Sequence, residues 1–189
     1  MKHKHNTLVW IDLEMTGLDY HRDVILEIAA IVTDAELNII ATGPNLVIHQ
    51  PDEVLENMNP WCIETHGASG LIQASKQSSI TTEQAEEEIL KFIEQHCQKG
   101  NAPLCGNTVW FDKLFLNKEM PLIVDFLHYR TVDVTAFKVM ISQWAGKDIV
   151  FKKNNTHRAL DDIKESIEEL KFYKNNFITI PDPLPVQTT

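Results

Sequence analysis

Runs of apolar residues predict strands in the first third of the chain and again beyond residue 100. Apolar side chains begin the stretch 8–17 and dominate 24–32 and 37–49, and the short links between these stretches favour an antiparallel meander. Shorter apolar runs at 103–107 and 131–134 predict two further strands. The pattern therefore indicates a sheet whose first three strands follow one another directly.

Apolar residues at helical spacing predict helices between and after the later strands. These helices are expected at 81–100, 108–120, about 135–144 and about 157–175. Thr81 and Gln84 have the spacing of a capping box at the start of the first helix, and Thr156 is the expected N-cap of the last. A meander followed by alternating helices and strands indicates an α/β fold, with a mixed five-stranded sheet flanked by helices.

Two acids interrupt the first apolar strand. Asp12 and Glu14 share one face with Leu8 and Trp10, because strand side chains alternate with period two. Two ionised carboxylates at about 4 Å repel each other by roughly 4 kcal/mol at an effective dielectric near 20. A strand that keeps such a pair needs something to neutralise it.

Two helices place further acids at the boundary of apolar surface. Asp112 lies three residues from both Val109 and Phe115, on the apolar stripe of its helix. In the last helix, Asp162 lies at the edge of the stripe, whereas Asp161 points away and is expected to be solvated. Asp133, in the strand "TVDV", is interpreted as structural.

The four boundary acids are typical of a site for hard cations. Carboxylate oxygen favours Mg²⁺ or Mn²⁺, and no Cys and His set has the spacing of a zinc site. We therefore predict that Asp12, Glu14, Asp112 and Asp162 hold two divalent cations, Mg or Mn. Two such ions about 4 Å apart can activate a water and steady the leaving oxygen in phosphodiester cleavage. His157 is the expected general base.

Composition and charge narrow the class of protein. Of 189 residues, 43% are hydrophobic and 23% charged, as in ordinary globular proteins, so we expect one domain over 1–180 and a loose Pro-rich tail over 181–189. The odd number of cysteines, with no C-x-x-C pair, and the absence of a signal-like start predict reduced thiols and a cytoplasmic location, without a membrane partner. The net charge of −10 argues against long duplex nucleic acid.

Three motifs, in order, resemble the DEDD superfamily of 3′–5′ exonucleases, in its histidine-containing branch. "DLEMTGL" (12–18) matches the first motif, "GNTVWFD" (106–112) resembles the second, and "HRALDD" (157–162) matches H-x-A-x-x-D. The strings "WCIETHGASGL", "HYRTVDV" and "THRALDDIKESIEELKFY" are similar to the oligoribonuclease family in particular, over about residues 7 to 178.

This resemblance implies a ribonuclease-H-like fold and a homodimer that removes nucleotides from very short RNA oligonucleotides, dinucleotides above all, in the cytoplasm. It implies that the four acids hold the metals and that His157 is the base. By the same resemblance, Leu18 wedges against the bases beside Met15 and Trp61. The residues implied around the 5′-phosphate are His66, Thr108, Arg130 and Thr135, with Tyr129 reaching it from the other subunit.

The chain departs from the family pattern at two places. Positions 108 and 135 are commonly Ser and are Thr here, which keeps a hydroxyl at each. Trp110 and Phe111 stand where smaller or polar residues are usual, and we expect them in the core. Two alternatives remain on the sequence alone: a DNA-directed proofreading or trimming exonuclease, and a catalytically silent nucleic-acid-binding protein of the same fold.

Overall fold

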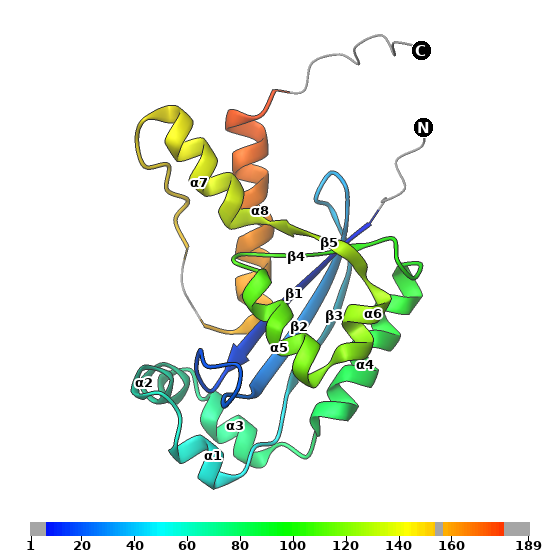
Figure 1. The fold of residues 1–189 in the computed structure, drawn as a ribbon. Coiled ribbons are helices and arrows are strands. Elements are labelled where there is room, and N and C mark those ends of the chain that lie inside the picture. Colours follow the sequence, from blue (N-terminus) through cyan, green and yellow to red (C-terminus); the bar gives the residue numbers. More distant parts are fainter. Residues whose placement is uncertain (1–6, 154–156, 180–189) are drawn as a thin grey trace.

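A mixed five-stranded sheet forms the centre of the molecule (Figure 1). The computed structural model describes residues 7–153 and 157–179. The strand order is β3-β2-β1-β4-β5, with the bounds β1 Thr7–Met15, β2 Ile25–Asp34, β3 Ile39–Val47, β4 Pro103–Gly106 and β5 His128–Asp133. The first three strands pair antiparallel, and β4 and β5 continue the sheet in parallel. The predicted fold class and meander are confirmed, and β5 begins three residues before the predicted 131.

Helices cover both faces of the sheet. On one face, Val9 and Ile11 of β1 pack with helices α4 (Thr82–His96), α5 (Trp110–Glu119) and α6 (Pro121–Phe126). On the other face, Trp10 packs with α7 (Val134–Ala145) and α8 (Ala159–Phe177). Because both faces are covered, β2 is buried almost throughout. Figure 1 shows α7 and α8 together on one side of the sheet.

The longer helices are close to their predicted bounds. The capping box of α4 is present, with Thr81 accepting from the Gln84 amide and Gln84 accepting from the Thr81 amide. Its predicted end at Gly100 is wrong, because the backbone becomes extended at Cys97. The predicted N-cap Thr156 and the predicted tail 181–189 lie outside the described residues.

Four short helices were not predicted. Their bounds are α1 Asp52–Glu56, α2 Pro60–Ala68, α3 Leu71–Gln77 and α6 Pro121–Phe126. In Figure 1, α1, α2 and α3 gather beyond the carboxyl end of β1, where Asn59 donates its backbone N–H to the Thr16 carbonyl at 3.2 Å. They therefore form a wall at the end of the strand that carries the two acids. Among the described helices, none is long and apolar enough to span a membrane.

Candidate active site

The first two acids lie where β1 runs out of the core. Asp12 and Glu14 alternate with the buried Leu13, so both side chains project on the face that Trp10 shares with α8. Asp12 and Glu14 are partly buried, and the Glu14 side chain is only 12% exposed. The strand therefore directs both carboxylates toward the beginning of α8.

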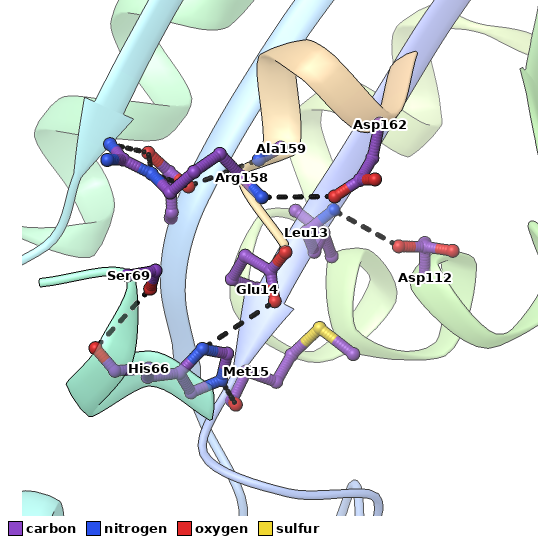
Figure 2. A network of polar contacts seen from close by, with 10 residues as sticks. Leu13, Glu14, Met15, His66, Ser69, Asp112, Arg158, Ala159 and Asp162 are labelled. Atoms are coloured by element: carbon purple, nitrogen blue, oxygen red, sulfur yellow. Dashed lines mark hydrogen bonds and ion pairs between the residues drawn. The ribbon is translucent and has the colours of Figure 1, made fainter. Parts of the chain in front are cut away.

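Asp162 and Asp112 reach the same strand end from two helices (Figure 2). Asp162 lies in the first turn of α8, and its Oδ2 accepts the Arg158 backbone N–H at 3.0 Å. Asp112 lies in the first turn of α5, is 8% exposed, and accepts the Leu13 backbone N–H at 3.2 Å. These contacts bring Asp112 and Asp162 to the end of the strand that carries Asp12 and Glu14.

The acids raise one another's pKa values. Burial raises the pKa of Asp12 well above its ordinary value, and the charges of Asp112, Glu14 and Asp162 raise it further. Burial and the neighbouring acids raise the pKa of Glu14 to about 8, and burial raises that of Asp112 to about 7. Burial also raises the pKa of Asp162. Lys153 and Arg158 offset these effects only in part, since they lower the pKa values of Asp12 and Glu14 by less than burial and the other acids raise them. A bound divalent cation would supply the remaining positive charge.

One group of ligand atoms fits a metal ion. Single ligand atoms of Glu14, His157 and Asp162 all lie within 4.8 Å of one another, and each residue is partly buried. A set dominated by carboxylate oxygen suits a hard divalent cation. When bound there, divalent cations would supply Lewis acidity toward a phosphodiester and a nearby water.

His157 lies next to an exposed aromatic ring. Its imidazole meets the Trp61 ring edge-on, with centroids 5.5 Å apart and an interplanar angle of 88°. Trp61 is 57% exposed in the first turn of α2. His157 has a φ of 51°, in the left-handed region that is sparsely populated for histidine. His157, the expected general base, therefore lies beside Trp61, which is expected to contact a nucleobase.

His66 lies behind Glu14. Its ring is 1% exposed, Nε2 donates to the Met15 carbonyl at 2.9 Å, and Nδ1 lies 3.9 Å from a Glu14 oxygen. Burial lowers the pKa of His66, so the contact with Glu14 is between a neutral ring and a carboxyl group rather than a charged pair. The implied role of His66 at a 5′-phosphate stays a prediction, and its visible role is to support the end of β1.

The two predicted hydroxyls come together at the start of α7. Thr108 and Thr135 have their hydroxyl oxygens 3.1 Å apart. Asp133 accepts the backbone N–H groups of both Thr108 and Thr135 at 2.9 Å, so it caps α7 and shapes this corner, in line with its predicted structural role. Thr108 has a φ of 52°.

A polar network that is buried at Ser166, Glu169 and Tyr173, here called the Glu169 network, joins this corner to α8. Asn107 accepts from the Thr135 hydroxyl at 3.2 Å and donates to Ser166 at 2.8 Å and Glu169 at 3.0 Å. Glu169 also accepts from the buried Tyr173 and pairs with Lys153 at 2.7 Å. Ser166 in turn donates to the Asp162 carbonyl at 2.8 Å. The threonine pair and the Asp162 turn are thus tied to one helix.

The other expected substrate residues are at the surface. Leu18 is 74% exposed and lines, with Asn59 and Pro60, a hollow of about 330 Å³. Tyr129 is 73% exposed, and the Arg130 guanidinium lies 5.4 Å from its ring centroid. Met15 is partly buried. Their proposed contacts with RNA remain predictions.

Two further predictions concern the burial of Trp110 and Phe111 and the exposure of Asp161. The expected core position of Trp110 is wrong, because this side chain is 57% exposed at the start of α5, whereas Phe111 is partly buried against Phe115. Asp161 is a surface acid, as expected, and pairs with Lys164 at 3.1 Å.

Sequence reasoning missed the ion pair between Glu27 and Arg158. The Glu27 side chain is 0% exposed and contacts the Arg158 guanidinium at 2.6 Å. An acid inside the apolar run "ILEIAAIV" was the available signal.

The prediction that the cysteines are unpaired thiols is confirmed for Cys62, Cys97 and Cys105.

Known proteins are similar to this chain over most of its length. A family model described as Exonuclease matches residues 9–170. An oligoribonuclease of Francisella tularensis subsp. tularensis is 54% identical over 175 residues, which is 93% of this chain and 98% of that protein. The mitochondrial oligoribonuclease of Mus musculus is 53% identical over 89% of this chain and 72% of its own length, and that of Haemophilus ducreyi is 53% identical over 92% and 95%.

Solved structures share the fold at much lower identity. Exonuclease I from Methylocaldum szegediense superimposes with a TM-score of 0.68 at 18% identity, over 90% of this chain. Escherichia coli exonuclease I, in complex with a dT13 oligonucleotide, gives a TM-score of 0.64 at 18% identity. The chain spans about two fifths of these exonucleases, 41% and 40% of their lengths. On the family model and the curated relatives, the chain belongs to the oligoribonuclease family of exonucleases.

Proposed function

We propose that this chain is a 3′-to-5′ exoribonuclease that degrades very short RNA oligonucleotides, especially dinucleotides, to mononucleotides. The observation that carries this proposal is the convergence of four acids and a histidine at the end of β1, with the pKa of every acid raised. Such a site is suited to phosphodiester hydrolysis with two divalent cations, Mg or Mn. The unpaired thiols are consistent with action in the reducing cytoplasm.

The residues of the site divide into two roles. Asp12, Glu14, Asp112 and Asp162 hold the cations through carboxylate oxygen. His157 accepts a proton from the attacking water at a ring nitrogen, which its position among Glu14, Asp162 and Trp61 allows. The neutral, buried His66 holds the Met15 carbonyl and so keeps the Glu14 end of the strand in place.

Exposed apolar side chains near the acids receive the bases. Trp61 offers a ring face to a base, and stacking of this kind contributes about 1–3 kcal/mol per base. Leu18 projects from the turn after β1 and separates the two bases, beside Met15. These contacts tolerate any base, because every base has an apolar face.

A small polar site receives the 5′ end. The Thr108 hydroxyl donates to a terminal phosphate, beside Thr135, whose own hydroxyl proton is donated to Asn107. Arg130 adds charge, since an arginine fork forms short charge-assisted hydrogen bonds. The Glu169 network holds the threonines in place relative to Asp162. A fixed separation between the 5′-phosphate site and the acids favours a substrate of two nucleotides. The net charge of −10 further disfavours a long strand, because its phosphates would find little positive surface.

Cleavage rate should fall steeply with RNA length, and Arg130→Ala should weaken this preference. Arg130 supplies the main charge of the 5′ site, so its removal lowers the advantage of a dinucleotide as well as its affinity. Single-turnover cleavage of 5′-phosphorylated RNAs of two to seven nucleotides measures both effects. Lys91→Ala, which removes a surface cation paired with Glu87 on α4, is the matched control and should retain the wild-type length profile.

Equal wild-type rates at all lengths would contradict the dinucleotide preference. DNA oligonucleotides of the same lengths, in the same assay, test the second enzyme hypothesis, because faster trimming of DNA would favour a proofreading or trimming role. No cleavage of either polymer in Mg²⁺ or Mn²⁺ would favour a silent binding protein.

We propose further that two copies of the chain form the working enzyme. An exposed apolar surface on α7 supports this proposal: Val139, Met140 and Trp144 are 50%, 43% and 76% exposed. Beside them, Phe137 and Ile178 help to line an apolar hollow of about 370 Å³. Monomers seldom leave such a surface uncovered. Tyr129 lies on the strand that leads into α7, and we place it at the partner's 5′ site.

Trp144→Glu should give a folded monomer that is nearly inactive on dinucleotides, because a charge at this surface opposes association and Tyr129 then reaches no partner. Sedimentation measures the mass, and circular dichroism measures the fold. Leu122→Glu, at an apolar residue of α6 that is 55% exposed, should remain dimeric and active. A Trp144→Glu monomer with wild-type activity would exclude a shared site.

A further inference from the structure

Glu27 is a buried acid that the proposed metal set does not include. It lies in β2, with a side chain that is 0% exposed, directly opposite Glu14 in the antiparallel ladder with β1. Burying a carboxylate is costly unless it is paired and hydrogen-bonded. The partners of Glu27 therefore indicate what it is held there to do.

The Glu27 carboxylate grips the residues that begin α8. The Arg158 guanidinium donates through Nε at 3.1 Å to each oxygen and through its terminal nitrogen at 2.6 Å. The Ala159 backbone N–H donates to Glu27 Oε2 at 3.2 Å, and Asn45 donates to Oε1 at 3.1 Å. Since α8 has no side-chain cap of its own at Arg158, Glu27 acts as its N-terminal acceptor from a neighbouring strand.

Arg158 connects Glu27 to two residues of the proposed chemistry. Its backbone N–H donates to Asp162 Oδ2 at 3.0 Å, which fixes the orientation of that carboxylate (Figure 2). Arg158 also directly follows His157 in the chain, and the His157 backbone has a φ of 51°, which is unfavourable for histidine. A residue stays in such a conformation only when its surroundings hold it there.

We propose that Glu27 is a positioning residue of the active site, which holds His157 and Asp162 in working geometry through its ion pair with Arg158. This inference rests on the proposed roles of His157 and Asp162. The alternative is a buried ion pair that only stabilises the fold. An ion pair with a buried partner is weak evidence for added stability. The planar guanidinium fork of Arg158, by contrast, meets the Glu27 carboxylate in one fixed geometry.

Glu27→Gln tests the proposal, because it keeps the shape and one acceptor oxygen but removes the charge that holds the guanidinium. We expect kcat on an RNA dinucleotide to fall by about 10- to 100-fold, as for other residues that orient metal ligands, while KM changes by less than about threefold. Mn²⁺ affinity, measured by electron paramagnetic resonance on the protein alone, should weaken by about tenfold, since Asp162 loses its fixed orientation.

Glu86→Gln is the matched control. Glu86 is also a buried acid, 8% exposed, and its carboxylate accepts the Leu122 backbone N–H at 2.6 Å near the start of α6, on the other face of the sheet. This variant should keep wild-type kcat and Mn²⁺ affinity even if its melting temperature falls. Equal losses in Glu86→Gln and Glu27→Gln would reduce Glu27 to a structural residue and overturn the proposal.

Arg158→Lys provides a second test that does not depend on burying a neutral amide. An ammonium group keeps the charge but cannot reproduce the bidentate fork, so kcat should fall in the same range. The double variant should lose no more activity than the worse single variant, because both changes break one unit. Additive losses, or wild-type Mn²⁺ affinity in Glu27→Gln, would overturn the proposal. If the unaltered protein does not cleave dinucleotides, the proposed function fails, while the Mn²⁺ titration still decides the role of Glu27.

Discussion

Replacing Asp112 with asparagine is expected to abolish hydrolysis of RNA dinucleotides, with kcat lower by roughly 10³-fold or more. The asparagine side chain would keep an oxygen for the Leu13 N–H, so the fold should survive while a charged metal ligand is lost. The same result is expected for Asp12, Glu14 and Asp162. Asp161→Asn is the control, because its side chain pairs with Lys164 at the surface. Activity that survives in Asp112→Asn would remove this residue from the metal set.

The same variant is expected to stabilise the metal-free protein at pH 8. A carboxyl group with a raised pKa binds its proton more tightly in the folded state, so stability falls as pH rises from about 4, its unfolded value, through its folded value. That folded value is about 7 for Asp112 and about 8 for Glu14. Asparagine removes the loss that comes from Asp112, about 4 kcal/mol for a pKa raised from about 4 to about 7, or about 8–16 °C in Tm at about 2–4 °C per kcal/mol.

Thermal unfolding in EDTA at pH 5 and pH 8 measures this effect. The gain for Asp112→Asn should be present at pH 8 and small at pH 5, where Asp112 and Glu14 of the wild type still hold most of their protons. Added Mg²⁺ should raise the Tm of the wild type more at pH 8 than at pH 5. A lower Tm for metal-free Asp112→Asn at pH 8 would mean that the carboxylates do not repel one another as described.

His157→Ala should lower kcat on a dinucleotide by roughly 10² to 10⁴, the usual contribution of a general base. Mn²⁺ binding should remain nearly intact if, as proposed, the carboxylates supply most of the ligands. The variant lacks the ring nitrogen that accepts a proton from water in the reaction, so the pH profile of its rate should differ from that of the wild type. A pH series of single-turnover rates measures both, with the exposed His21→Ala as the control.

The metal titration separates two roles for His157. One of its ring nitrogens lies within 4.8 Å of ligand oxygens of Glu14 and Asp162, a distance that also suits a metal ligand. If His157→Ala loses Mn²⁺ affinity together with activity, His157 is a ligand and the base must be sought elsewhere. Retained affinity with lost activity supports the base.

The parts of the fold that the sequence predicted are those whose pattern is local. The strands and long helices bury a continuous stripe, and the register of α8 placed Asp162 inward and Asp161 outward before any contact was known. The short helices α1, α2 and α3 bury few residues each, so their periodicity is weak, and tertiary contacts such as that between Asn59 and Thr16 decide their position.

The candidate site residues that the sequence could indicate are acids placed among apolar residues. Asp12, Glu14 and Asp112 were recognisable because an ionised group on an apolar stripe needs a partner. Pairing between distant segments was not recognisable, so the Glu27 and Arg158 pair and the contact of His66 with Met15 emerged only from the structure. Trp110 was misplaced because aromatic character alone does not specify burial.

If the threonine pair binds the 5′ end as proposed, the Glu169 network makes the accepted substrate length a property of the protein core. Its members Glu169 and Tyr173 are 2% and 0% exposed, and groups buried this deeply open with much of the free energy of global unfolding. The spacing between the threonine pair and Asp162 is therefore as durable as the packing of α8 on the sheet. An engineer who wants a relative that accepts longer RNA would have to redesign that packing, because exchanging surface loops leaves the spacing intact.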